Sequence, residues 1–70
     1  MSKEITKRQQ QVLNIVKNSI KERGIAPSHK EIADILGVAS YKTAADHLTS
    51  LEKKGYIKIH TGISRGVQVL

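Results

Sequence analysis

Residues 40–54 carry short polar side chains and lysines in a pattern that could contact the edges of DNA bases. A lysine can donate to guanine O6 and N7, a carboxylate can accept from cytosine N4, and Ala or Thr methyl groups can touch thymine methyls. A helix face that only meets solvent more often carries Glu and Lys at i,i+4 spacing, although a plain solvated face remains the alternative. The side chains concerned are Ser40, Lys42, Thr43, Ala45, Asp46, Thr49, Lys53 and Lys54.

A second place for chemistry is the segment 60–66, which presents Ser64 and Arg65 next to each other. A hydroxyl and a guanidinium can both bind phosphate oxygens, and an arginine can also enter a minor groove. Arginines are common in surface loops, so this pair is a weak indication by itself. Its weight depends on the elements that surround it.

Patterns typical of catalysis or metal binding are missing from the sequence. His29, His47 and His60 lie 18 and 13 residues apart, without the i,i+3 or i,i+4 spacing of common metal sites. There is no cysteine, and no nucleophile-elbow or phosphate-loop pattern surrounds the serines and lysines. We therefore predict no enzyme activity, metal, cofactor or small-molecule ligand, and we expect His47 to be partly buried.

The composition favours a polyanionic partner. The 70 residues include 12 Lys and Arg against 6 Asp and Glu, which gives a net charge of +6. Two tyrosines are the only aromatic residues, which argues against proteins that stack single-stranded bases on aromatic platforms. No apolar run approaches the roughly 18 residues of a spanning helix, and nothing resembles a signal peptide. We therefore expect a soluble cytosolic protein that is not associated with a membrane.

The elements that must position these side chains begin with a helix over residues 7–23. Thr6 and Gln9 fit the capping-box pattern, apolar residues then recur at helical spacing, and Gly24 suits the left-handed residue that ends a helix. Because the apolar arc of this helix is needed for a core, the helix is a poor candidate for membrane binding.

A short helix over residues 29–36 should follow. Ser28 and Glu31 give a second capping box, and Gly37 ends the segment. A helix of about two turns is marginal alone and must be held by tertiary packing. The apolar face predicted for it comprises Ile32, Ala33, Ile35 and Leu36.

Ser40 is a plausible N-cap for a third helix over residues 41–54, on which Ala44, Leu48 and Leu51 share one face. The small Ala33 would let the second and third helices approach closely, as in a helix-turn-helix whose second member enters the major groove. Periodicity alone fits an ordinary helical hairpin in a small bundle equally well.

After residue 55 the period changes from helical to alternating. Residues 56–59 and 67–69 alternate apolar and polar side chains, and the glycine-containing segment between them reads as a hairpin loop. The predicted fold is therefore α+β and mostly helical. It is a single three-helix winged helix-turn-helix domain over residues 1–70, with a C-terminal two-stranded hairpin wing over 56–70.

These segments resemble the N-terminal DNA-binding domain of the LexA repressor family over essentially the whole chain. The resemblance implies sequence-specific binding of double-stranded DNA by a repressor of DNA-damage-response (SOS) genes, as a homodimer on a palindromic operator. It also implies a location in the bacterial or phage-type cytoplasm, associated with the nucleoid. By position it implies base contacts from Ser40, Lys42, Thr43, Ala45 and Asp46, and DNA-backbone contacts from Ser28, Thr49, Lys53, Lys54, Ser64 and Arg65. The matching stretches are residues 6–10, 24–28, 31–33, 36–37, 44–48, 51–55 and 63–66.

Two departures from the family change the expectation. Lys42 and Ala45 stand where well-known members carry Asn and Glu, so we expect an operator that differs from the usual CTGT half-site. The self-cleaving serine protease domain of the family has no counterpart in these residues, so we expect no self-cleavage, either in an excised domain or in a naturally short protein. Binding by one such module should be weak. The competing hypothesis is a free-standing winged-helix interaction module that binds a repressor or another protein and modulates its DNA binding.

Overall fold

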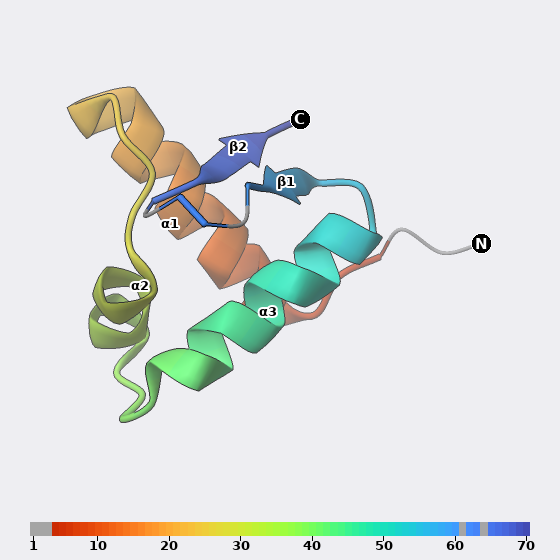
Figure 1. Cartoon of the computed structure of the whole chain (residues 1–70). Helices are drawn as coiled ribbons and strands as arrows, with labels where there is room; N and C mark the ends of the chain where they lie inside the picture. Colours follow the sequence, from red (N-terminus) through yellow and green to blue (C-terminus); the bar gives the residue numbers. More distant parts are fainter. Residues whose placement is uncertain (1–3, 61, 64) are drawn as a thin grey trace.

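The computed structural model describes residues 4–60, 62–63 and 65–70, and within them three helices are followed by a small antiparallel hairpin on one side of the molecule (Figure 1). This order confirms the predicted winged helix-turn-helix class. The elements are α1 (Lys7–Arg23), α2 (His29–Leu36), α3 (Tyr41–Lys53), β1 (Ile57–Ile59) and β2 (Val67–Val69).

Both predicted capping boxes are present. The Thr6 hydroxyl accepts from the Gln9 amide at 3.1 Å, and the Gln9 side chain accepts from the Thr6 amide at 3.1 Å. At α2 the Ser28 hydroxyl accepts from the Glu31 amide at 3.1 Å, while Glu31 Oε1 accepts from the Ser28 amide at 2.8 Å. Caps of this kind stabilise a helix by about 1 kcal/mol each, which matters most for the short α2.

The turn between α2 and α3 depends on Gly37. Its φ of 77° lies in the left-handed region, where a side chain is strained. The Val38 amide then donates to the Ala33 carbonyl at 3.1 Å, and the Ser40 hydroxyl accepts from the Lys42 amide at 3.2 Å. The last turn of α2 and the first turn of α3 are therefore both closed by hydrogen bonds, which defines where one helix ends and the next begins.

One apolar core joins all five elements. Residues from the three helices and β1 are almost completely buried, and Val67 and Val69 of β2 pack against them while remaining partly exposed. The core holds the inner face of α3 and leaves the opposite face to solvent. Its fully enclosed members are Val12, Leu13, Val16, Ile32, Ala33, Ala44, Leu48, Leu51 and Ile57.

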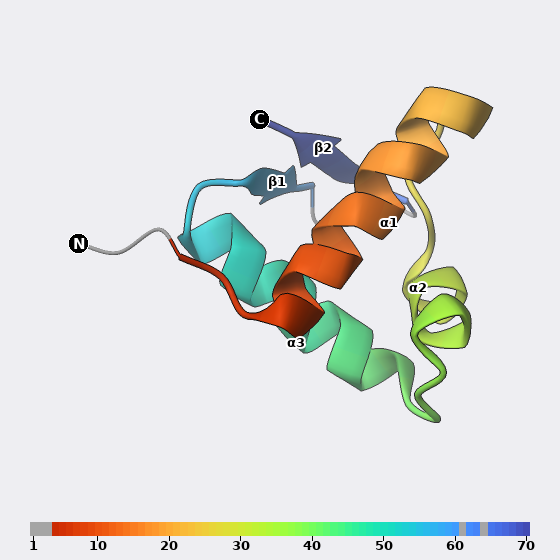
Figure 2. The same ribbon diagram turned by 180° about the vertical axis from the view of Figure 1, so that it is seen from behind.

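The hairpin lies beside α1 and the C-terminal end of α3, with its loop turned toward the connection between α1 and α2 (Figure 2). Its register pairs Ile57 with Val69 and Ile59 with Val67. Gly66 is required there, because an added Cβ would lie 2.7 Å from the His60 carbonyl oxygen. The backbone at Gly66 is therefore packed closely against His60 and Ile63 at the base of β2.

Three details differ from the sequence prediction. Ile35 was expected on the apolar face of α2 but is 66% exposed. The buried direction of α2 runs through Ile32 and Ala33, and at about 100° per residue Ile35 points sideways from it. The third helix ends at Lys53 and not at residue 54. The first strand begins at Ile57, one residue later than predicted, because the preceding amide closes the end of α3.

Candidate nucleic-acid interface

The outward face of α3 presents most of the side chains that the sequence assigned to base contacts. Ala44, Leu48 and Leu51 turn inward and are completely buried, which forces the intervening positions outward. The N-terminal half of α3 lies at the edge of the molecule next to α2 (Figure 1). Of the predicted base-contacting residues, Ser40, Lys42, Thr43 and Asp46 are exposed and Ala45 is half-buried.

Hydrogen-bonding groups at this end of α3 are available to a partner. The Ser40 hydroxyl oxygen caps the helix, but its own hydrogen remains free to donate. Lys42 and Asp46 stand one turn apart, and no ion pair joins them in the described part of the chain. The surface thus offers an ammonium donor, a carboxylate acceptor and small methyl groups within two turns of helix.

Three of the predicted backbone-contacting residues lie on α3 or at the start of α2. Lys53 is exposed at the last turn of α3, and Thr49 is exposed with its hydroxyl donating to the Ala45 carbonyl at 3.0 Å. Ser28 is half-buried because its hydroxyl and amide serve the cap of α2. Lys53 is the only cation among these three residues.

Lys54 has partners inside the protein. Its Nζ donates to the Glu4 carbonyl oxygen at 2.7 Å and to Gln9 Oε1 at 3.1 Å, and the residue is half-buried. Lys54 therefore ties the C-terminal end of α3 to the cap of α1. A phosphate would have to share this ammonium group with those two acceptors.

Arg65 also points back into the protein. Its Nη1 donates to the Ala26 carbonyl oxygen at 3.2 Å and forms an ion pair with the Glu31 carboxylate. Arg65 has a φ of 61°, a conformation that few non-glycine residues adopt. These contacts hold the wing loop against the start of α2. The neighbouring predicted contact, Ser64, lies outside the described residues.

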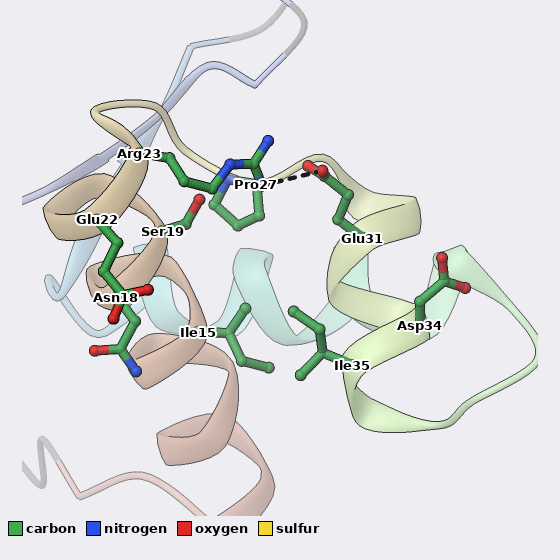
Figure 3. Close-up of a pocket in the computed structure, with 9 residues that line it drawn as sticks. All are labelled: Ile15, Asn18, Ser19, Glu22, Arg23, Pro27, Glu31, Asp34 and Ile35. Carbon is green, nitrogen blue, oxygen red and sulfur yellow. Dashed lines mark hydrogen bonds and ion pairs between the residues drawn. The ribbon is translucent and has the colours of Figure 1, made fainter.

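Glu31 is the centre of this ion-paired cluster. Besides the Ser28 amide and Arg65, it accepts from Arg23 Nη1 at 3.2 Å (Figure 3). The three elements α1, α2 and the wing therefore meet on one carboxylate. The hydrogen bond from Arg65, followed by the Ser28 amide and Arg23, lowers the pKa of Glu31 from 4.5 to about 2, against a smaller opposing effect of desolvation. The carboxylate is therefore ionised at all physiological pH values.

Sequence reasoning missed two features of this region. It assigned Glu31 only to the capping box, because an ion pair across 34 positions leaves no local pattern. It also assigned no role to Tyr41, which is the first residue of α3 and is 65% exposed beside Lys42. The position directly after a predicted N-cap was the signal that could have identified it. His47, by contrast, is half-buried as predicted.

Other kinds of site find little support in the structure. Among the residues described, no group of three or more His, Cys, Asp or Glu side chains is placed to hold a metal ion. Within the same residues, no helix is both long enough and apolar enough to cross a membrane.

Comparison with known proteins supports the resemblance. The family described as the LexA DNA binding domain matches residues 2–66. The chain is 53% identical over its whole length to a LexA repressor of Alcanivorax borkumensis, and 40% identical over its whole length to one of Caldicellulosiruptor saccharolyticus. Over 97% of its length it is 46% identical to the LexA repressor of Psychromonas ingrahamii.

The chain spans about a third of the length of these relatives: 34% of the first, 35% of the second and 32% of the third. The matched part includes all three helices and β1, and ends at the glycine before β2. Family match, full coverage of the chain and the winged helix-turn-helix fold agree. The chain belongs to the LexA DNA-binding domain family.

Proposed function

We propose that this chain binds double-stranded DNA sequence-specifically, as the operator-binding domain of a LexA-like transcriptional repressor of DNA-damage-response genes. The observation that carries the proposal is the set of exposed, mostly short and polar side chains on the N-terminal half of α3, in a chain of net charge +6. The relatives above are named LexA repressors, which supports the same function. On this proposal the chain acts in the cytoplasm, by binding and not by catalysis.

In this function α3 lies in the major groove, which is wide enough to admit a helix. Lys42 donates to a guanine, Asp46 accepts from a cytosine amino group, and Thr43 offers both a hydroxyl and a methyl group. Ala45 is half-buried, and its side chain offers a base a methyl contact and no hydrogen bond. Ser40 completes the proposed base-contacting set at the first turn of the helix.

Backbone contacts in this proposal come from Ser28, Thr49 and Lys53 around α3, and from the wing. Arg65 can contribute without releasing Glu31, because a guanidinium has five N–H donors and the contacts to Glu31 and Ala26 use only Nη1. Lys54 can contact a phosphate only to the extent that its ammonium group is shared with the Glu4 carbonyl and Gln9. Ser64 remains a proposed phosphate contact beside Arg65.

The proposal includes a homodimer on a palindromic operator. A single module of this kind buries only about 600–1,000 Å² of protein surface on DNA, which predicts weak binding by one chain. Two chains related by a two-fold axis would read two half-sites, with recognition helices spaced by roughly 34 Å or a multiple of it. Dimer formation would then follow from operator symmetry.

Selection from randomised duplex DNA tests the proposal most directly. The expected result is an enriched palindrome whose half-site differs from CTGT at the positions read by Lys42 and Ala45. The spacing between half-sites would also give the dimer geometry. A chain that enriches no sequence, although it remains folded at the temperature of selection, would contradict the proposed function.

A further inference from the structure

A groove of about 440 Å³ runs between α1 and α2, and we refer to it as the α1–α2 groove. Its lining residues come from α1, from α2 and from the connection between these helices, whereas α3 lies behind it (Figure 3). Ile15 of α1 and Ile35 of α2 point toward each other across the groove, and Pro27 lines it between the helices. The groove is open to solvent and has an aliphatic floor.

The two isoleucines do not close on each other. Ile35 is 66% exposed and Ile15 is half-buried, so a sizeable aliphatic surface faces water on this side of the molecule. The same two residues also border a neighbouring hollow of about 300 Å³, which Arg8 and Asn14 help to line. The groove therefore continues along α1 and is longer than a site for one small molecule needs to be.

The charge around the groove has the opposite sign to that of the whole chain. Three of the six acidic residues, Glu22, Glu31 and Asp34, line it together with one basic residue, Arg23. Glu31 is ion-paired with Arg23 and with the wing. In the described part of the chain, Glu22 and Asp34 take no part in an ion pair. Two uncompensated carboxylates thus flank an aliphatic floor on a chain of net charge +6.

We infer that the α1–α2 groove docks a basic segment of a partner protein, with an aliphatic side chain between Ile15 and Ile35 and with Lys or Arg beside Glu22 and Asp34. The aliphatic floor supplies area to bury, which drives association without direction. The carboxylates select the sign of the flanking charges and exclude acidic partners. DNA is excluded as the occupant by the same carboxylates.

The groove and α3 use different residues, so the partner and a duplex can occupy the chain at the same time. This inference does not depend on the proposed operator binding, because no residue of the groove belongs to the base-contacting set. Partner binding would place a second protein next to whatever α3 contacts. The function added is the recruitment of a basic protein segment.

The test uses the whole 70-residue chain, labelled with ¹⁵N, and a short capped probe peptide, Lys-Lys-Leu-Lys-Lys. Two control peptides replace the central leucine by serine or the four lysines by glutamates. The expected result is that only the first peptide, at millimolar concentration, shifts the amide resonances of Ile15, Asp34 and Ile35. A chain of net charge +6 repels a basic peptide in general, so localised binding would report the groove itself.

Substitutions sharpen the test. Ile35→Ala should weaken peptide binding about five- to tenfold because it removes part of the aliphatic floor, and Asp34→Asn should weaken it about two- to fivefold by removing one charge. Ile63→Ala is the matched control for peptide binding, because Ile63 is 64% exposed on the wing and lies outside the groove. Thermal unfolding of each variant verifies the fold, and duplex binding should stay unchanged in the two groove variants, Ile35→Ala and Asp34→Asn.

Several results would overturn the inference. If the basic peptide shifted no amide resonance, or if the serine or glutamate peptide caused equal shifts, the proposed basic and aliphatic partner would be contradicted. If Ile63→Ala weakened peptide binding as much as Ile35→Ala does, the peptide would bind outside the groove. Groove resonances that shift with chain concentration alone would identify a second copy of this chain as the occupant. A loss of duplex binding in Ile35→Ala with unchanged stability would assign the groove to DNA.

Discussion

The face of α3 and the cluster around Glu31 are both polar, yet they differ in how their side chains are used. Around Glu31 one carboxylate meets two arginines and a backbone amide, so its groups have partners inside the protein. On α3, Lys42 and Asp46 face solvent without pairing within the described residues. Satisfied polar groups fix a structure, whereas exposed and unpaired ones remain available for a ligand. The comparison separates the residues that hold the wing from those that we propose contact a partner.

The largest effect on this comparison should come from Lys42→Ala. Loss of one good base contact costs about 1–3 kcal/mol of discrimination, so the variant should change base preference in the selected operator. Its thermal stability should stay within about 0.5 kcal/mol of that of the parent chain, because surface substitutions away from special features have small effects. Selection and calorimetry on the same preparation measure both. If the free energy of unfolding fell by as much as the free energy of DNA binding, Lys42 would act by holding the fold and not by contacting a base.

Lys54→Ala should show the opposite behaviour. Removing the ammonium group leaves the Glu4 carbonyl and the Gln9 side chain without this donor. We expect a loss of about 1 kcal/mol, or roughly 4–8 °C in Tm for a chain of this size. Thermal unfolding followed by circular dichroism measures it. An unchanged Tm combined with weaker binding to every duplex would instead assign Lys54 to phosphate contact.

Lys53→Ala is the matched comparison for Lys54→Ala at the adjacent position. Lys53 is exposed, so removing its side chain should leave Tm unchanged and weaken binding to all duplexes uniformly. The slope of log K against log salt concentration should fall by about 1, because one fewer counterion is displaced from the phosphates. Mobility-shift titrations across a salt series check this prediction. If the affinity of the parent chain for DNA did not depend on salt concentration, the proposed phosphate contacts would be wrong.

The smallest effect, and the one with the clearest pH dependence, should come from Glu31→Gln. The folded pKa of Glu31 is about 2, below its ordinary value of 4.5, so its ionised form stabilises the fold above pH 4.5. That contribution is lost as the pH falls from 4.5 toward 2. The variant should therefore melt a few degrees below the parent chain at pH 7, and the difference should shrink toward zero near pH 2. A difference independent of pH would mean that the charge of Glu31 has no part in holding the wing.

Local sequence patterns predicted most of the fold. Thr6 with Gln9 and Ser28 with Glu31 act over three residues, and Gly37 acts through its own φ, so each could be recognised without the structure. Ile35 could not be placed, because two turns of helix define the buried direction poorly. The partners of Arg65 and Lys54 lie 34 and 45 positions away, beyond any local pattern. For the site, the exposure of α3 followed from the helical period, while the base contacts themselves stay a prediction.

The link between Lys54 and Glu4 also determines where labels can be attached. It holds the N-terminal segment at the C-terminal end of α3, and the Leu70 amide donates to the Tyr56 carbonyl at the same end at 3.1 Å. Glu4 and Leu70, the first and last described residues, therefore both lie near the C-terminal end of α3, away from the first turn of that helix (Figure 1). A fluorophore or an affinity tag attached at Leu70 would leave the first turn of α3 unobstructed.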